Sequence, residues 1–383
     1  MNKTIKALAL TATVALMGFA PVMADTAAPT VKVDGLVDAY YTYNFTNSAN
    51  KLQGSGNSGY WYNSVDNSYS LGIAETKITA TQGSATGVVE LAYVDAANAA
   101  GLALPTGTGL GLLQAYASYN TGAWTFTAGR FTTWMGFEVV ESESNWNYSH
   151  SLLFGYIPVW NQGLSVSLAV DPTLTITGYA TNGWNQSVNP ASFGAETFGA
   201  EIAWVPNSMW KFVINAVDGP GTATGGLGGS TSYDTSVGEF IATYAPTSDW
   251  SFALDAEYGM EDLGGANGTD IVSGNAISSN DFWGVALYGK YAIASDWTGS
   301  LRLEEMKDEQ GVLGIYSDHN GPVEGREATL TLTHAFTPAW TTSLEGRYDY
   351  VVENGTVPGA GAGPFAAGSA DQLTATLSTG FVF

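Results

Sequence analysis

Glutamates and a histidine are the residues best suited to chemistry in segment 132–159, which is otherwise rich in aromatic side chains. Glu138, Glu141 and Glu143 stand close together there, and His150 follows them. Grouped carboxylates concentrate cations around a narrow passage. A catalytic role would instead need a nucleophile and a base within hydrogen-bond reach of each other. Serines beside His150 do not establish that arrangement, so this segment favours the attraction of cations.

Other sites of chemistry have little support in the sequence. The chain has no cysteine, which excludes disulfides and thiolate metal sites. The acidic pairs at 261–262 and 308–309 lack the ligand spacing of a calcium-binding loop. His319 lies in a long connection. His334 lies on the same face of its predicted strand as apolar residues, which favours a position at the membrane interface over a catalytic one. We therefore predict no enzyme activity, no cofactor and no metal site.

The composition is acidic and yet apolar. There are 12 Lys and Arg against 35 Asp and Glu, a net charge of −23, so we exclude nucleic acid as a partner because it is also negative. Hydrophobic residues make up 45% of the chain and charged residues only 12%, which is unusual for a soluble acidic protein. The 13% of aromatic residues and the 47 glycines favour a sheet with interface belts and tight bends.

The first residues have the pattern of a secretory signal peptide. Lys3 and Lys6 precede an apolar stretch at 7–19, and small residues at 22–24 offer a cleavage site. We predict that residues 1–24 are removed and that 25–383 form one mature domain. The stretch is shorter than the ~20 apolar residues of a membrane-spanning helix, and no later run is long enough for one. If this exported chain lies in a membrane, it does so as a closed barrel.

Alternating polar and apolar residues, in stretches of about ten, predict sixteen antiparallel strands. The connections alternate between short and long, as in bacterial barrels with short periplasmic turns and long extracellular loops. An error of one hairpin would give fourteen or eighteen strands. We predict an all-β transmembrane barrel that closes by pairing the first strand with the last. The predicted strands are 31–45, 69–82, 86–95, 110–120, 123–131, 160–170, 173–182, 196–205, 209–218, 235–245, 249–259, 281–293, 296–306, 326–336, 340–351 and 371–383.

Tryptophan recurs immediately after the short turns. Amphipathic indole rings collect at membrane interfaces, so these residues predict an aromatic girdle at the periplasmic end. The last strand ends on Phe383, an aromatic C-terminus that we interpret as a signal for barrel-assembly machinery. The predicted girdle consists of Trp124, Trp210, Trp250, Trp297 and Trp340.

The same alternation places the charged residues of the strands on one face. A charge that faces lipid at mid-bilayer costs ~2–4 kcal/mol, so this face must be luminal. Acids outnumber bases on it, and a net negative field remains even if every base forms a salt bridge. The predicted luminal charges are Asp34, Asp38, Glu90, Glu201, Lys211, Glu239, Asp255, Glu257, Lys290, Arg302, Glu304, Glu345, Arg347 and Asp349.

Two strands interrupt the alternation. In 69–82 the charged residues Glu75 and Lys77 share the parity of apolar residues, which predicts a β-bulge. Arg130 also shares the parity of lipid-facing residues. It either extends toward the outer rim or follows a break in the strand at Gly129, and we favour the break.

Segment 132–159 is the longest connection and the third extracellular loop. Water disfavours its aromatic surface, so we predict that the loop folds back against the inner wall and narrows the pore. Glu138, Glu141 and Glu143 would then line the constriction, where a low-dielectric wall focuses their field. The alternative is a packed external cap whose acids are solvated.

Two parts of the chain resemble a known family. The run AGRFTTWMGFEVVESESNWNYSHSLLFGY, the later TLTITGYATNGWNQ and the opening VKVDGLVDAYYTYNF are similar to the β-barrel porin-2 (OmpL-like) family. The resemblance is specific over about 31–45 and 127–185, and beyond them only the alternation remains. It implies an outer-membrane, porin-like protein and does not supply a substrate. Relatives often carry a basic residue after NWNYS, where this chain has His150.

Together these observations predict a porin of the bacterial outer membrane. Its water-filled channel would allow passive diffusion of ions and small hydrophilic solutes, with a preference for cations. Its partners would be outer-membrane lipid, those solutes and cations, and barrel-assembly machinery, and the apolar exterior leaves a homo-oligomer open. The alternative is a barrel that conducts little and serves as a surface scaffold or adhesin, which the glycine-rich loops at 219–230 and 352–370 favour.

Overall fold

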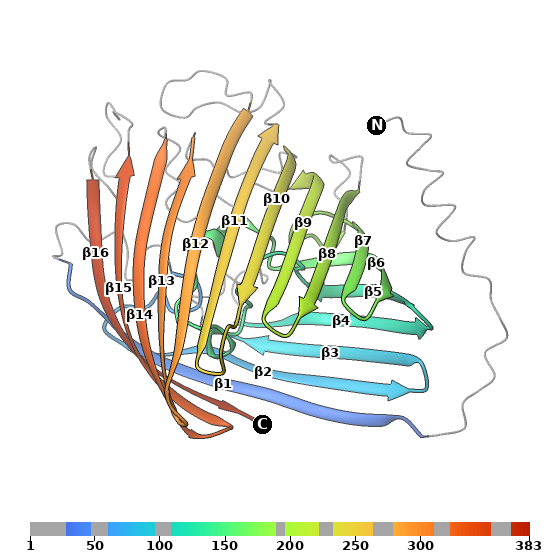
Figure 1. Ribbon diagram of the computed structural model, residues 1–383, viewed down its shortest axis with the longest axis horizontal. Coiled ribbons are helices and arrows are strands. Elements are labelled where there is room, and N and C mark those ends of the chain that lie inside the picture. The colour runs from blue at the N-terminus through green and yellow to red at the C-terminus, as the bar shows by residue number, and fades with distance from the viewer. Residues whose placement is uncertain are drawn as a thin grey trace.

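Sixteen antiparallel strands form a closed barrel in a computed structural model of the chain (Figure 1). Each strand pairs with its neighbours in sequence, and β1 pairs with β16 to close the ring. The predicted number of strands and the predicted closure are therefore confirmed. The predicted signal peptide lies outside the described part of the chain. The structure describes residues 28–46, 60–95, 109–188, 196–221, 233–262, 279–309, 322–353 and 369–383.

Every strand boundary lies within three residues of the predicted one. Period-two alternation is a strong signal here because each strand separates lipid from the barrel interior. The strands are β1 Thr30–Asn44, β2 Tyr69–Gln82, β3 Ala85–Tyr93, β4 Leu110–Thr121, β5 Trp124–Thr132, β6 Trp160–Asp171, β7 Leu174–Thr181, β8 Thr197–Asn207, β9 Trp210–Gly221, β10 Tyr233–Tyr244, β11 Trp250–Asp262, β12 Ser279–Ala294, β13 Trp297–Asp308, β14 Val323–Thr337, β15 Trp340–Glu353 and β16 Ser369–Val382.

Burial along each strand alternates with the same period. In β13, Leu301 and Leu303 are 42% and 46% exposed on the outside, whereas Arg302 and Glu304 are 0% and 5% exposed. The apolar side chains therefore form the outer surface, and the charged side chains face inward. All fourteen predicted luminal charges lie on inward-facing positions of their strands.

The five tryptophans of the predicted girdle each open a strand after a short turn, at β5, β9, β11, β13 and β15. They therefore lie at the end of the barrel where the short turns lie. Two of them pack on an aromatic neighbour across the strand pair: Trp210 stacks on Tyr244 at 4.2 Å, and Trp250 lies tilted against Tyr291 at 4.4 Å between ring centroids. At the C-terminus, Phe383 exchanges two backbone hydrogen bonds with Gly35 of β1, which extends the closing pair of strands.

The predicted bulge in β2 is confirmed. The pairing of β1 with β2 shifts register between Val37, which faces Ala74, and Ala39, which faces Leu71. The extra residue brings Ile73, only 1% exposed, and the charged positions after it onto the inner face.

The predicted break at Gly129 is wrong. β5 pairs with β6 without a register shift from Trp124 to Thr132. Gly129 absorbs the distortion with a φ of +133°, a conformation that suits glycine. Arg130 keeps its outward parity, donates from Nε to the carbonyl oxygen of Leu113 at 3.2 Å and stacks on Trp160. The irregularity lies instead in β4, whose register to β3 shifts at Leu113.

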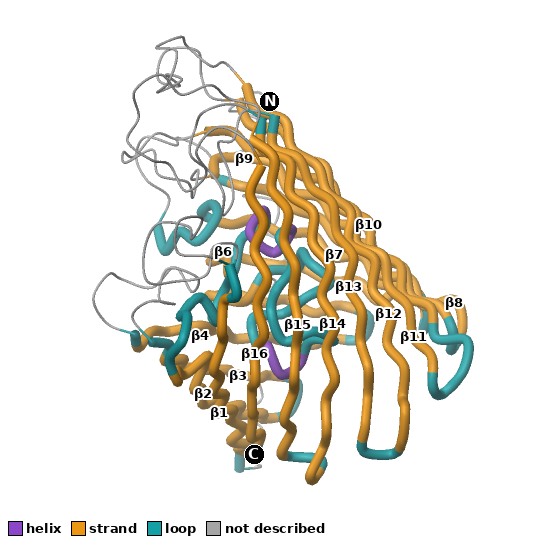
Figure 2. The backbone as a smooth tube through the Cα atoms, turned by 90° about the vertical axis from the view of Figure 1, so that its left-hand side faces the viewer, coloured by secondary structure: helices purple, strands orange, loops and turns teal. Residues whose placement is uncertain are grey.

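The connection between β5 and β6 contributes nine residues to the hydrophobic core of the described part of the chain. This connection carries two short 3-10 helices, η2 Ser142–Ser144 and η3 Leu153–Tyr156, and lies within the ring of strands (Figure 2). Its residues Leu152, Leu153 and Met135 are at most 2% exposed. Among the described residues, no helix is long and apolar enough to cross a membrane.

Candidate functional site

Carboxylates on the inner wall accept hydrogen bonds from the backbone of loop 133–159. Glu304 of β13 accepts from the N–H groups of Leu152 and Leu153, both at 2.7 Å. Glu345 of β15 accepts from Tyr148 at 2.7 Å and Ser149 at 3.1 Å. An irregular loop needs partners for its backbone groups when it is buried, and these wall acids supply them.

The same arrangement continues on the neighbouring wall. Glu239 of β10 accepts from the N–H of Gly136 at 2.8 Å, and Asp255 of β11 accepts from the N–H of Phe137 at 3.2 Å. Four strands, β10, β11, β13 and β15, therefore hold the loop through side-chain acceptors.

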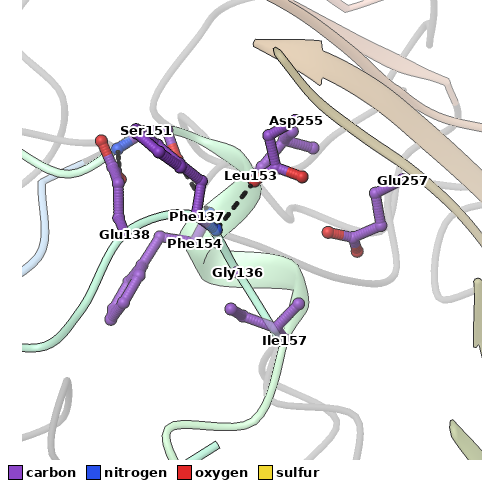
Figure 3. A pocket seen from close by; sticks show the side chains of 9 residues that line it. All are labelled: Gly136, Phe137, Glu138, Ser151, Leu153, Phe154, Ile157, Asp255 and Glu257. Atoms are coloured by element: carbon purple, nitrogen blue, oxygen red, sulfur yellow. Dashed lines mark hydrogen bonds between the residues drawn. The ribbon is translucent and has the colours of Figure 1, made fainter. Parts of the chain in front are cut away.

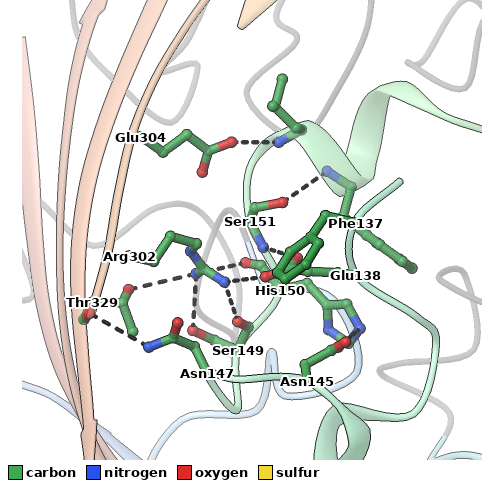
Figure 4. A network of polar contacts seen from close by, with 12 residues as sticks. Phe137, Glu138, Asn145, Asn147, Ser149, His150, Ser151, Arg302, Glu304 and Thr329 are labelled. Carbon is green, nitrogen blue, oxygen red and sulfur yellow. Dashed lines mark hydrogen bonds and ion pairs between the residues drawn. The ribbon is translucent and has the colours of Figure 1, made fainter. Parts of the chain in front are cut away.

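Two arginines satisfy the loop's oxygen atoms. Arg302 forms ion pairs with Glu138 of the loop and Glu327 of β14, each at 2.6 Å, and donates to the carbonyl oxygens of Ser149 and His150 (Figure 4). Arg347 donates to the same His150 oxygen at 2.6 Å and pairs with Asp349 at 2.7 Å. Both guanidinium groups are at most 1% exposed, so they belong to the packed interior.

The structure corrects the prediction that Glu138 lines an open constriction. Its side chain is 3% exposed and lies between Arg302 and the N–H of Ser151. Burial alone would raise the pKa of Glu138, but the Arg302 guanidinium beside it holds that pKa below its ordinary value. Glu138 is thus an ionised, neutralised anchor of the loop, because its partner reaches it from β13.

Most of the predicted luminal charges are likewise covered by the loop rather than exposed to a pore. The hydrogen bonds of the loop end on the inner face of β9 to β11, β13 to β15 and β1. Partly or fully exposed positions remain at Asp34, Glu201, Lys211 and Lys290. The covered positions are Asp38, Glu90, Glu239, Asp255, Glu257, Arg302, Glu304, Glu345, Arg347 and Asp349, each at most 5% exposed.

Glu141 reaches a second group of acids on the other side of the lumen. Its carboxylate and those of Glu75 in β2 and Glu90 in β3 place one oxygen each within 4.8 Å of the others. Lys77 lies 3.4 Å from Glu90. Burial raises the pKa of Glu141 above its ordinary value. The group retains more acids than bases even after this ion pair.

Glu143 lies against the closing strands. It accepts a hydrogen bond from the hydroxyl of Thr341, and burial raises its pKa. A side chain at Gly380 of β16 would overlap the Glu143 side chain, so this glycine allows the acid to lie flat on the wall. The three glutamates of the loop therefore lie in three separate environments.

His150 is a buried, neutral side chain. Its Nε2 atom lies 2.7 Å from the carbonyl oxygen of Val139, which can only accept, so Nε2 carries the proton. Its Nδ1 atom is buried without a partner, and burial lowers the pKa of His150. His334 lies on the outer face beside Trp297 at 4.5 Å, while His319 lies outside the described residues.

The sequence did not identify several residues that complete this interior. Tyr60 and Tyr62, from the connection between β1 and β2, are 5% and 1% exposed. Tyr62 packs on His150 at 5.2 Å, and Arg347 stacks on Tyr60. The aromatic run at 60–62 in a polar connection is the signal that points to burial. Glu327 pairs with both Arg302 and Arg347. Its inward direction, unlike the burial of the two tyrosines, follows from the alternation of polar and apolar residues in its strand.

These features define the protein as an outer-membrane β-barrel of the porin type, with an apolar outer surface and a loop folded inside. The chain belongs to the family described as "Putative beta-barrel porin-2, OmpL-like", which matches residues 30–383.

Solved outer-membrane channels share the fold. The outer membrane channel DcaP of Acinetobacter baumannii is 14% identical, with a TM-score of 0.64 over 94% of this chain and 98% of that one. An anion-selective porin from Comamonas acidovorans is 12% identical, with a TM-score of 0.58 over 93% and 100%. The trimer form of OmpT from Vibrio cholerae is 11% identical, with a TM-score of 0.58 over 93% and 100%. No curated protein sequence matches this chain.

Proposed function

We propose that this protein is a passive porin of the bacterial outer membrane, which conducts ions and small hydrophilic solutes and prefers cations. The inner wall of β4 to β8 is only partly covered by the loop, and this supports the proposal. Inward-facing Ser118, Ser165 and Glu201, on β4, β6 and β8, keep partial exposure, although Trp134 of the loop stacks on Tyr179 of β7. The inward-facing acids of β10, β11, β13 and β15 are buried instead. Water-filled space along β4 to β8 is the proposed path of solutes.

The acidic group of Glu75, Glu90 and Glu141 carries the proposed preference for cations. It joins the loop to β2 and β3, beside the partly covered wall of β4 to β8, and its carboxylates place one oxygen each within 4.8 Å of the others. Lys77 is the base that pairs with it among the described residues. The ionised carboxylates of such a group attract cations and repel anions in a narrow, low-dielectric passage.

The test is single-channel conductance of the refolded mature protein in a planar bilayer with a salt gradient. We expect a steady current whose reversal potential favours cations, and a smaller cation preference for Glu141→Gln. The matched control is Glu324→Gln, which removes a charge from an outward-facing position of β14 3.9 Å from Lys307. Equal selectivity of the wild type and Glu141→Gln would refute the role of this acidic group.

The alternative function is a surface scaffold with a closed lumen. The packed loop and the buried Tyr60 and Tyr62 favour it, because both occupy the interior. A correctly folded barrel that conducts no current would make this the leading function.

Assembly follows the same proposal. We infer that residues 1–24 are cleaved, that the short turns and the tryptophan girdle face the periplasm, and that Phe383 is read by barrel-assembly machinery. A homo-oligomer is part of the proposal, since the Vibrio cholerae neighbour is described in a trimer form.

A further inference from the structure

Three acids crowd the barrel wall beneath the start of the loop. Glu239 on β10 and Glu257 on β11 are direct cross-strand neighbours, and Asp255 lies two residues from Glu257 on the same face. Their exposures are 4%, 4% and 3%. Like charges that face each other across a strand pair destabilise the sheet, so this group needs either a counter-charge or bound protons.

No base among the described residues balances these acids. The other ionisable groups that interact with them are Glu201 of β8, Tyr288 of β12, Glu304 of β13 and Glu138 of the loop. Arg302 of β13 is engaged by Glu138 and Glu327. Lys211 of β9 acts on Glu201, and Lys290 of β12 lies over the ring of Trp146. The counter-charge is therefore missing on every described element that packs against the three acids.

A hydrogen bond between two of the acids locates one proton. Glu239 and Asp255 share a side-chain hydrogen bond, which requires a proton because a carboxylate only accepts. Both oxygens of Glu239 already accept, one from the N–H of Gly136 and one from Asn215. Asp255 is therefore the neutral acid of the pair. It also accepts from the N–H of Phe137 with Oδ2 at 3.2 Å.

The surroundings of Glu257 locate a second proton. Both of its oxygens are buried without a hydrogen-bond partner. The side chain points from β11 toward the loop, into a gap lined by Glu138, Ser151 and Ile157 (Figure 3), and this gap has no room for a water molecule. Burying an ionised carboxylate without a partner costs far more than burying a neutral carboxyl group. Glu257 is therefore neutral as well.

We propose that Asp255 and Glu257 each hold a proton at neutral pH and that these two protons form a latch, which fixes loop residues 136–138 to the barrel wall. Protonated Asp255 joins Phe137 to Glu239, and Glu239 holds Gly136. Removal of the protons at alkaline pH leaves three carboxylates side by side in a gap without water. Their repulsion releases the start of the loop. The latch goes beyond the proposed pore, since it acts on the loop whether or not the barrel conducts.

The latch has a defined pH dependence. The folded barrel binds more protons here than the unfolded chain, in which these acids are exposed and ionised at neutral pH. The stability from the latch is full below about pH 4, where exposed carboxyl groups are protonated too. It is lost as the pH rises until the folded barrel releases its protons. Asparagine and glutamine copy the shape of the neutral acids and do not titrate, so Asp255→Asn/Glu257→Gln keeps the latch closed.

Loop mobility tests the latch on the full refolded barrel in detergent. The chain has no cysteine, so Val139→Cys, at a loop position that is 45% exposed, carries a single spin label beside residues 136–138. We expect the label to be immobile at pH 7 and mobile at pH 10. Asp255→Asn/Glu257→Gln should keep it immobile at both pH values. A wild-type label that stays immobile at pH 10, or a release that persists in the double variant, would overturn the latch.

The matched control for this experiment is Glu261→Gln. Glu261 lies on the same face of β11 and is 1% exposed, but it pairs with Asn280 rather than with the loop. We expect this variant to release the label at pH 10 as the wild type does. A label that stays immobile in Glu261→Gln would show that the release depends on the charge of β11 in general, which contradicts the latch.

Infrared spectroscopy keeps the proposal falsifiable if a variant folds poorly. A neutral carboxyl group has a C=O stretching band separate from the bands of a carboxylate, and an ester-free detergent leaves that region clear. At pH 7 we expect this band in the wild type, a weaker band in Asp255→Asn and in Glu257→Gln, and an unchanged band in Glu305→Gln, whose side chain is exposed on the outer face. A wild type without the band, or equal bands in all four proteins, would overturn the two protons. A silent channel whose label is still released at pH 10 would refute the pore and leave the latch standing.

Discussion

Arg302 and Glu138 form a buried ion pair, with Nη1 and Oε1 2.6 Å apart and side chains 0% and 3% exposed. It joins β13 to a loop that lies far from that strand in the sequence. Such a pair is a weak source of net stability, because desolvation offsets the attraction of the charges. Its loss is costly, however, since either partner alone is a buried charge. The pair therefore specifies where the loop docks.

Replacing Arg302 should release the loop. Arg302→Met leaves Glu138 as a buried carboxylate without its base and removes the donor to the carbonyl oxygen of Ser149. Glu327 and the carbonyl oxygen of His150 keep Arg347 as a partner. We expect the free energy of unfolding to fall by about 3–5 kcal/mol, measured by urea unfolding in phospholipid vesicles. Single-channel recordings should show larger, noisier currents, because the loop no longer holds one position.

A second arginine of the barrel provides the control for this experiment. Arg326 pairs with Glu305 at 2.8 Å on the outer face, with side chains 57% and 48% exposed. Exposed pairs contribute at most about 1 kcal/mol, so Arg326→Met should change stability by less than that. Equal losses for the two variants would show that Arg302 does not anchor the loop.

Glu304 provides a test of the backbone acceptors. Glu304→Gln replaces an oxygen by an NH₂ group that faces the N–H groups of Leu152 or Leu153. We expect a loss of about 1–3 kcal/mol in the free energy of unfolding. Glu305→Gln, the next residue on the outer face, should cost less than about 1 kcal/mol. If the two variants unfold alike in urea, the wall carboxylates do not hold the loop.

The barrel could be predicted from the sequence because its physics is repetitive. Leu301 faces lipid and its neighbour Arg302 faces the barrel interior, so shifting a strand's register by one residue would exchange the lipid-facing and luminal side chains. Irregularities within the strands were harder to locate. The bulge before Ile73 places charged residues at positions that otherwise carry apolar ones, so the sequence pattern revealed it. The bulge at Leu113 places no charge at such a position, and at Gly129 a positive φ keeps the strand continuous where the pattern suggested a break.

The interior could be predicted only in part. Alternation places Glu304 and Glu345 inward, but it does not say whether they meet water or protein. Their partners are backbone groups of an irregular loop, which has no period to reveal its path. Glu138, Glu141 and Glu143 look equivalent in the sequence, yet each meets a different wall. Those contacts depend on the closed shape of the barrel.

Gly199 shows how closely the loop approaches the wall. A Cβ atom at this position of β8 would overlap the indole ring of Trp134, which stacks on Tyr179 at 3.9 Å. Gly199→Ala should displace this ring and cost about 1–3 kcal/mol by overpacking. Gly238→Ala, whose Cβ meets nothing within 4 Å, is the control in the same urea experiment. Retained stability in Gly199→Ala would contradict the docking of Trp134.

His150 makes loop docking sensitive to acid. Burial lowers the pKa of His150 from its ordinary value of 6.5, so the folded protein binds fewer protons here than the unfolded chain. The contribution of His150 to stability is therefore full above pH 6.5 and is lost as the pH falls below it. Glu141 and Glu143 act in the opposite direction, because their raised pKa values favour the folded state at low pH and lose that effect as the pH rises above 4.5.

The variant His150→Gln separates these contributions. Its amide can still donate to the carbonyl oxygen of Val139, but it does not titrate. Between pH 7 and pH 5 the wild type should therefore lose more stability than the variant, measured as the shift of the urea midpoint. His334→Gln removes a histidine from the outer face and should keep the response of the wild type. If His334→Gln flattens the pH profile and His150→Gln does not, the acid sensitivity lies outside the loop, and His150 is only a packed side chain.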